Sequence, residues 1–137
     1  MLLVRHAWAG DRDDWAGDDR MRPLDERGRA QAGALVALLE PFVLEALVSS
    51  PYLRCVQTLE PLASARGLEI EQHEELGEER QANEGARLLE QLVDEDVAVC
   101  VHGGVQSAVL PADARFPKGC AWFLVPGDPP RFIAPPA

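Results

Sequence analysis

The sequence predicts an α/β fold: a three-layer sandwich with a mostly parallel central sheet and helices on both faces. Short apolar runs alternate along the chain with segments in which apolar residues recur at helical spacing, which is typical of a parallel sheet covered by helices. One run, VAVCV at 97–101, is continuous and uncharged, as in a strand buried on both faces. The 137 residues fit one domain spanning 1–137.

The first elements follow from local signals near the beginning of the chain. An apolar run predicts a strand at 1–4, and the charged stretch DRDDWAGDDRMR at 11–22 predicts a polar loop. Asp25 can cap a helix that extends to about Glu40, because apolar residues recur there on one face. Pro41 ends this helix.

A second strand and helix are predicted next. The strand covers 46–48, and Ser50-Pro51 provides an N-cap followed by proline at the first helical position. The helix is expected to run toward Arg66, with Gly67 as its C-terminal stop. Pro61 falls inside this span, so we expect a kink or a break there.

The remaining chain predicts further strands around one more helix. Residues 68–70 read as a weak strand, and 84–93 as a helix with its leucines turned inward. The buried strand at 97–101 follows. CAWFLV at 120–125 and RFIA at 131–134, on either side of PGDPP, predict a hairpin at the sheet edge.

Composition excludes several classes of partner. The net charge is −10, from 13 Lys+Arg against 23 Asp+Glu, so neither a nucleic-acid nor an anionic-membrane partner is expected. Arg5 interrupts the first apolar run, so we expect no signal peptide. An odd number of cysteines at no metal-ligand spacing predicts reduced thiols in a cytoplasmic protein and no metal site. These are Cys55, Cys100 and Cys120.

Polar side chains follow the predicted strands at their carboxyl ends. Arg5 and His6 end the first strand, Arg54 lies in the first turn after the second, and His102 ends the run at 97–101. Ligands of open α/β sheets bind at this edge, so these residues are expected to converge. Arginine forks and a helix N-terminus suit a phosphate, which Arg5 would grip. His6 is then a candidate nucleophile, since a neutral imidazole can attack phosphorus.

Four blocks of the sequence, LVRHA, RPLDERGRAQA, VSSPYLRCVQT and VHGG, together resemble the histidine phosphatase superfamily with its phosphoglycerate-mutase-like fold. The likeness runs from residue 1 to about 107, and the blocks occur in the family's order. The short length and Ala7 after Arg5-His6 resemble its small branch, which includes SixA-type phosphohistidine phosphatases. The segments at 5–32 and 115–125 are similar to the phosphatase half of proteins that fuse a Nudix hydrolase to this fold.

The resemblance implies a role for each matching residue. His6 is implied as the nucleophile that becomes phosphohistidine, and Arg5, Arg54 and His102 as the phosphate clamp. In this family an acid from the middle of the chain protonates the leaving group. Glu78 fits the family's Leu-x-Glu pattern, with two neighbouring glutamates, Glu75 and Glu79, as alternatives.

The function that follows is a metal-independent phosphatase without a cofactor. It would hydrolyse a phosphomonoester or phosphoramidate through phosphohistidine on His6, acting on a phosphorylated small molecule or a phosphohistidine protein. The alternatives are a SixA-type protein phosphohistidine phosphatase and a non-catalytic phosphate-binding module. The sequence indicates neither the substrate nor the oligomeric state. Three arginines of the polar loop either contact substrate or balance nearby aspartates: Arg12, Arg20 and Arg22.

Overall fold

A six-stranded sheet forms the centre of the computed structural model, which describes residues 1–136. The strand order is β3-β2-β4-β1-β5-β6. The first four strands along the chain are parallel to one another, whereas β5 and β6 run antiparallel at one edge. This arrangement confirms the predicted α/β fold, the mostly parallel sheet and the edge hairpin. The strands are β1 (Leu2–Arg5), β2 (Ala46–Ser49), β3 (Ile70–Gln72), β4 (Val97–Val101), β5 (Ala121–Phe123) and β6 (Arg131–Ile133).

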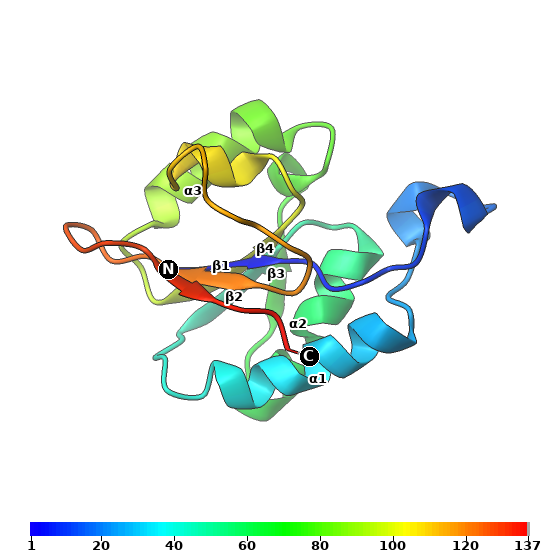
Figure 1. Ribbon diagram of the computed structural model, residues 1–137, viewed down its shortest axis with the longest axis horizontal. Helices are drawn as coiled ribbons and strands as arrows, with labels where there is room; N and C mark the ends of the chain where they lie inside the picture. Colours follow the sequence, from blue (N-terminus) through cyan, green and yellow to red (C-terminus); the bar gives the residue numbers. More distant parts are fainter. Residues whose placement is uncertain (137) are drawn as a thin grey trace.

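Helices cover both faces of the sheet, as Figure 1 shows: α1 (Glu26–Leu38) and α2 (Leu53–Arg66) lie on one side and α3 (Ala86–Leu92) on the other. Alternate residues of each central strand enter separate cores. Leu2 packs with the leucines of α1 and α2, whereas Leu3 packs in the cluster that contains Leu89 of α3. Because both faces of β4 are covered, all its residues are buried, which explains the continuous apolar run.

The capping signals place the helix ends well, with one exception. The carboxylate of Asp25 accepts the Gly28 N–H at 2.8 Å, as expected of an N-cap, and Gly67 ends α2 with a φ of 65°. The expected N-cap at Ser50 is wrong. The chain stays extended through Tyr52, which is the N-cap of α2, because the Ser50 hydroxyl is engaged elsewhere.

Three other sequence-based boundaries differ from the structure. The helix α2 continues through Pro61 without a break, since buried Leu59 and Leu62 hold it to the core on either side. Strand β3 begins at Ile70, two residues later than predicted. A π-helical turn, η4 (Gln81–Gly85), precedes α3, which therefore starts at Ala86 rather than Glu84.

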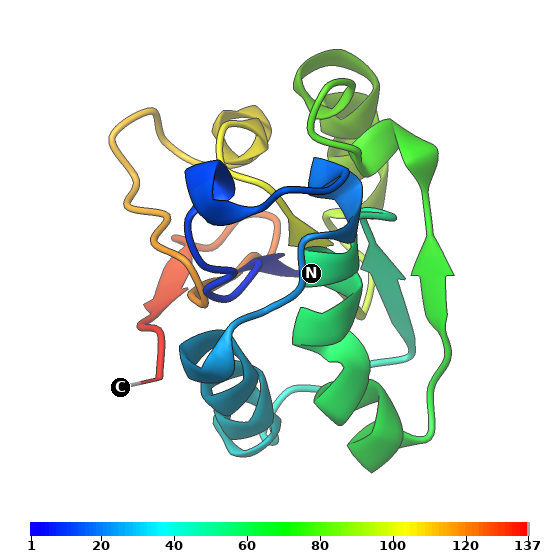
Figure 2. The same ribbon diagram turned by 90° about the vertical axis from the view of Figure 1, so that its right-hand side faces the viewer.

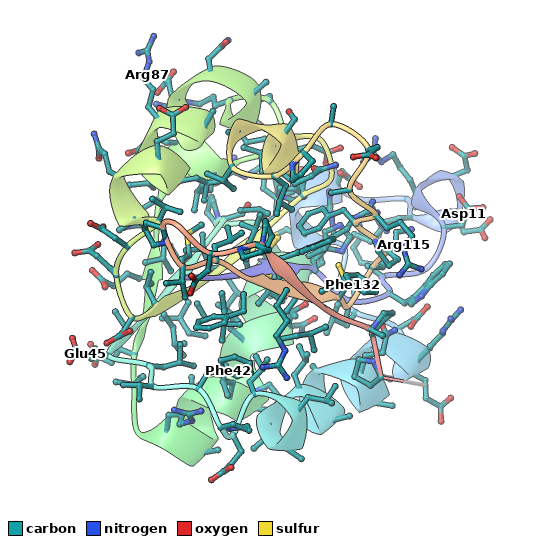
Figure 3. The ribbon with its side chains drawn as sticks, turned by 60° about the vertical axis from the view of Figure 1, so that its left-hand side comes forward. Asp11, Phe42, Glu45, Arg87, Arg115 and Phe132 are labelled. Atoms are coloured by element: carbon teal, nitrogen blue, oxygen red, sulfur yellow. The ribbon has the colours of Figure 1, made fainter. Side chains whose placement is uncertain are left out.

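Short 3-10 turns gather at the edge where the parallel strands end, and Figure 2 looks onto this edge. Asp11, beyond the end of β1, and Glu45, before β2, lie at opposite ends of the molecule (Figure 3). The turns at the carboxyl edge are η1 (Arg12–Asp14), η2 (Asp19–Met21), η3 (Glu74–Leu76) and η5 (Val105–Ala108).

All three cysteines are free and buried. Among residues 1–136, no helix combines the length and the apolar character that crossing a bilayer requires.

Candidate active site

A cavity of about 620 Å³ opens at the carboxyl edge of the parallel strands. It brings together the four residues whose convergence the sequence predicted, Arg5, His6, Arg54 and His102, and Glu78 lies in its wall as well. The two histidine rings are 5.5 Å apart between centroids. Residues separated by about a hundred positions in the chain therefore share one site because β1 and β4 are neighbours in the sheet.

His6 is held as a neutral ring by its surroundings. Its backbone N–H donates to the Val101 carbonyl at 3.1 Å, and its Nδ1 lies 2.8 Å from the Ala7 carbonyl oxygen. A carbonyl only accepts, so Nδ1 carries the proton and Nε2 keeps its lone pair. Burial lowers the pKa of His6 well below 6.5, and the positive charges on nearby groups, including Arg54, lower it further.

Arg54 lies in the first turn of α2, and its side chain is almost fully buried. Its Nη1 donates to the Asp19 backbone carbonyl at 2.9 Å, and its Nη2 donates to the Asp19 carboxylate at 3.2 Å and to Glu78 Oε2 at 2.5 Å. The guanidinium fork thus already binds oxygen atoms in the geometry that suits a phosphate.

Hydrogen bonds with Ser50 and Gln81 fix the orientation of His102. The Ser50 hydroxyl accepts the Tyr52 N–H at 3.3 Å, and its own O–H can donate to His102 Nε2, 2.8 Å away. With the Ser50 hydroxyl as donor, Nε2 of His102 accepts and Nδ1 faces the cavity as the N–H group. Gln81 Oε1 accepts the His102 backbone N–H at 3.2 Å, and Gln81 Nε2 donates to the Gly103 carbonyl. Sequence reasoning missed Ser50, because its position before a proline indicated a helix cap.

Several buried donors of the clamp have no acceptor within the described part of the protein: Arg5 Nε, Arg54 Nε and His102 Nδ1. Arg5 uses its Nη1 to bind the Phe116 carbonyl at 2.8 Å. The Arg5 guanidinium packs closely against Gly103, where a side chain would interfere, since a Cβ there would lie 3.1 Å from the guanidinium carbon. Buried polar atoms are rarely left without partners, so a set of unpaired donors around one cavity is the arrangement expected of an anion site.

The glutamates that the sequence left as alternatives are separated by position. Glu78 lines the cavity, where Oε1 pairs with Arg12 Nη2 at 2.7 Å and Oε2 lies 3.9 Å from His102 Nδ1. Glu79 accepts a hydrogen bond from the Tyr52 hydroxyl, which lowers its pKa. Neither Glu79 nor Glu75 lines the cavity.

The arginines of the loop at 11–22 also differ in position. Arg12 and Arg22 line the cavity, whereas Arg20 does not and instead pairs with Glu74 at 3.2 Å. Arg22 is buried, and it donates to the Ala9 carbonyl at 2.6 Å and pairs with Asp19. Arg12 and Arg22 therefore pair with acidic residues, and both also line the cavity.

Lys118 lines the cavity and was missed by the sequence analysis. It is the only lysine of the chain, which was an available signal. Its ammonium nitrogen lies 4.4 Å from the centre of the Trp8 ring. Of the two tryptophans in the segment after His6, Trp8 lines the cavity and Trp15 does not, and the Trp15 indole N–H donates to the Asp18 carbonyl.

A family model of the histidine phosphatase superfamily (branch 1) matches residues 1–85, which is more than half of the chain. The chain belongs to the histidine phosphatase superfamily. The match covers three of the four blocks on which the resemblance rested, and the name of the family indicates a phosphatase.

This histidine phosphatase is 36% identical over 143 residues to an 8-oxo-(d)GTP phosphatase of Mycolicibacterium smegmatis. The match covers 93% of this chain but 44% of that protein, so the chain spans less than half of its relative.

Solved structures share the fold at lower identity. The protein histidine phosphatase SixA complexed with tungstate matches with a TM-score of 0.74 and 23% identity, covering 98% of this chain and 94% of that one. A mycobacterial glucosyl-3-phosphoglycerate phosphatase matches with a TM-score of 0.62 and 19% identity, covering 80% of this chain and 76% of that one.

Proposed function

We propose that this histidine phosphatase hydrolyses a phosphomonoester through a covalent phosphohistidine on His6. The observation that supports this most directly is the state of the His6 ring, which is neutral with its proton on Nδ1 and its Nε2 unprotonated. Arg5, Arg54 and His102 supply N–H donors around it, and such groups stabilise the charge of a transferring phosphoryl group.

The reaction would take two steps. His6 Nε2 attacks phosphorus, an N–P bond forms, and the bond to the leaving oxygen breaks with its electron pair on that oxygen. The carboxylic acid form of Glu78 gives this oxygen its proton. Water then attacks phosphorus while the Glu78 carboxylate takes a proton from it, and the N–P bond breaks with its pair returning to Nε2.

Glu78 must exchange partners to act in this way. In the structure it is a carboxylate that pairs with Arg12 and Arg54, whereas a general acid has to be neutral when the leaving group departs. A phosphate that binds Arg54 would compete with Glu78 for the guanidinium, and its negative charge would favour the protonated carboxyl. Substrate binding would therefore prepare the acid.

The nucleophile is tested with His6→Ala, and with His73→Ala as a control for loss of a histidine outside the cavity. We expect His6→Ala to abolish phosphate release and His73→Ala to retain it. Wild-type protein quenched at alkaline pH during turnover should carry one acid-labile phosphate, located on His6 by peptide mass spectrometry. Substantial turnover by His6→Ala would rule out the mechanism, and tight phosphate binding without any turnover by wild type would indicate a binding module.

The acid is tested with Glu78→Gln on two substrates that differ in leaving group. General acid catalysis is typically worth about 10²- to 10⁴-fold. We expect a loss of that order with an alkyl phosphate and a much smaller loss with p-nitrophenyl phosphate, whose leaving group needs no proton. Glu75→Gln and Glu79→Gln are the matched controls. Equal losses on both substrates would assign Glu78 a positioning role instead.

A further inference from the structure

The cavity extends well beyond the space that a single phosphoryl group needs. Its volume of about 620 Å³ falls among pockets that enclose small molecules, which measure roughly 300–1,000 Å³. The phosphate clamp occupies one part of its wall. Trp8 and Lys118 also line the cavity, and the proposed reaction assigns neither of them a role.

The backbone that carries the nucleophile also fixes Lys118. The Phe116 carbonyl accepts the Arg5 Nη1 hydrogen bond, and the Gly119 N–H lies 3.2 Å from the Arg5 carbonyl oxygen and 3.1 Å from that of His6. Gly119 has a φ of 84°, so this turn favours glycine. Lys118 lies between these anchors, so the position of its backbone relative to His6 is set by the Arg5 side chain on one side and by the Gly119 N–H on the other.

The ammonium group of Lys118 lies among other cations. Burial lowers its pKa, and the positive charges of Arg5, Arg22, Arg54 and Arg12 lower it further. Within residues 1–136, Lys118 takes part in none of the ion pairs. An anion bound here would offset this repulsion.

The carboxylates in the cavity wall are engaged by other groups. Asp25 accepts the N–H groups of Gly28 and Gly10, and Asp11 accepts the Asp13 N–H. Glu78 pairs with Arg12 and Arg54, as described above. The positive charge of Lys118 is therefore left for a bound anion to neutralise.

We propose that Lys118, beside the Trp8 ring, forms a second anion subsite that selects small-molecule phosphomonoesters whose leaving group carries another phosphate or a carboxylate. The inference rests on the proposed function, because it assigns the leaving-group side of the same cavity. A phosphohistidine protein offers an imidazole leaving group without such an anion and gains nothing from this subsite.

The kinetic test compares substrates that differ by one anionic group. One pair is a nucleoside diphosphate and the matching monophosphate, and the other is phosphoglycerate and glycerol phosphate. We expect wild-type kcat/KM to be higher for the member with the additional anionic group in at least one pair. The ratio of the two kcat/KM values within that pair measures the preference. Lys118→Gln should reduce this ratio about tenfold, which is the scale of one charge-assisted hydrogen bond. The pair that responds identifies the second anion as phosphate or carboxylate.

Arg115→Gln is the matched control for the loss of one positive charge on the same segment. Arg115 stacks on Phe132 with its guanidinium carbon 4.5 Å from the ring centre, outside the cavity wall (Figure 3). We expect this variant to keep the wild-type ratio. An equal ratio for both members of both pairs in wild type, or a ratio that Lys118→Gln leaves unchanged, would overturn the subsite.

A binding measurement separates this inference from catalysis. Reductive ¹³C-methylation places one probe on Lys118 and one on the N-terminal amine, because the chain has no other lysine. We expect methylenediphosphonate to shift the Lys118 methyl resonance more than methylphosphonate does at equal site occupancy. This result would stand even if His6→Ala remained active and the proposed chemistry failed. Equal shifts from both ligands would contradict the subsite while leaving the nucleophile untouched.

Discussion

The two histidines of the cavity, His6 and His102, present different ring nitrogens to it. His6 directs its Nδ1 proton to the Ala7 carbonyl and leaves the Nε2 lone pair available. His102 directs Nε2 to the Ser50 hydroxyl, which leaves its Nδ1–H as a donor. One ring is therefore suited to attack and the other to hold an anion, although their centroids are only 5.5 Å apart.

The lowered pKa of His6 gives a prediction for its titration. Burial disfavours the imidazolium, so the ring should remain neutral as the pH falls below 6.5 and should take up a proton only well below that value. The unfolded chain protonates near 6.5, so it binds more protons than the native state in this range. The contribution of His6 to the free energy of unfolding should therefore decrease as the pH falls from 6.5 to the native pKa.

NMR of ¹⁵N-labelled histidine side chains measures this midpoint, and the spectrum of His6→Ala assigns the resonance. Single-turnover release of p-nitrophenol should show the same midpoint, since that leaving group needs no acid. A His6 titration midpoint at or above pH 6.5 would show that burial does not determine the pKa of this ring.

At the scale of elements, the contact between α1 and the segment after β1 depends on one glycine. A Cβ on Gly28 would lie 1.9 Å from the Trp8 carbonyl oxygen, whereas a Cβ on Gly33 of the same helix would meet nothing within 4 Å. We expect Gly28→Ala to lower the free energy of unfolding by about 3 kcal/mol, through overpacking against backbone. Gly33→Ala should raise it by about 0.5–1 kcal/mol, because alanine favours the helix.

Urea denaturation of both variants measures these changes. Because Trp8 follows His6, the proposed nucleophile, by two residues, Gly28→Ala should also lower kcat/KM, and Gly33→Ala should not. Similar stabilities for the two variants would mean that α1 can move away from this segment without cost.

The sequence predicted those elements whose signals are local. Asp25 and Gly67 mark helix ends by side-chain and backbone preferences that need no distant partner, and the structure confirms both. A break at Pro61 does not occur, because buried Leu59 and Leu62 hold the helix to the core on either side. Lys118 could not be placed, because its proximity to His6 depends on the antiparallel pairing of β5 with β1.

The approach of Arg5, His6, Arg54 and His102 was predictable for a general reason. Parallel strands place their carboxyl ends at one edge, so residues at the ends of neighbouring strands such as β1 and β4 come together there. Glu78 lies outside this rule, since it comes from the irregular segment between η3 and η4. Its position follows from ion pairs with Arg12 and Arg54, which only the folded chain reveals.

For the molecule as a whole, charge is distributed unevenly. The net charge is −10, yet five of the thirteen basic residues line the cavity of about 620 Å³ at the carboxyl edge. They are Arg5, Arg12, Arg22, Arg54 and Lys118. These fixed cations can stabilise transferred phosphate charge in the way that a divalent ion does in other phosphatases.

We therefore expect full activity after dialysis against EDTA and no increase on addition of magnesium. Vanadate should inhibit competitively, and its inhibition constant should rise with ionic strength because the contact is electrostatic. Phosphate release assayed before and after chelation measures the first expectation. Loss of activity on chelation with recovery by a divalent ion would contradict it.

The buried, unpaired donors around the cavity lower the stability of the fold but are the groups proposed to bind phosphate. Arg5 Nε, Arg54 Nε and His102 Nδ1 find no acceptor in the described part of the protein, and each such group lowers the free energy of unfolding by roughly 1–3 kcal/mol. Selection for thermal stability alone would therefore favour replacements that remove these donors, and the same replacements would weaken phosphate binding. A thermostabilised variant of this protein is best sought on the surface of its helices, with this edge of the sheet left unchanged.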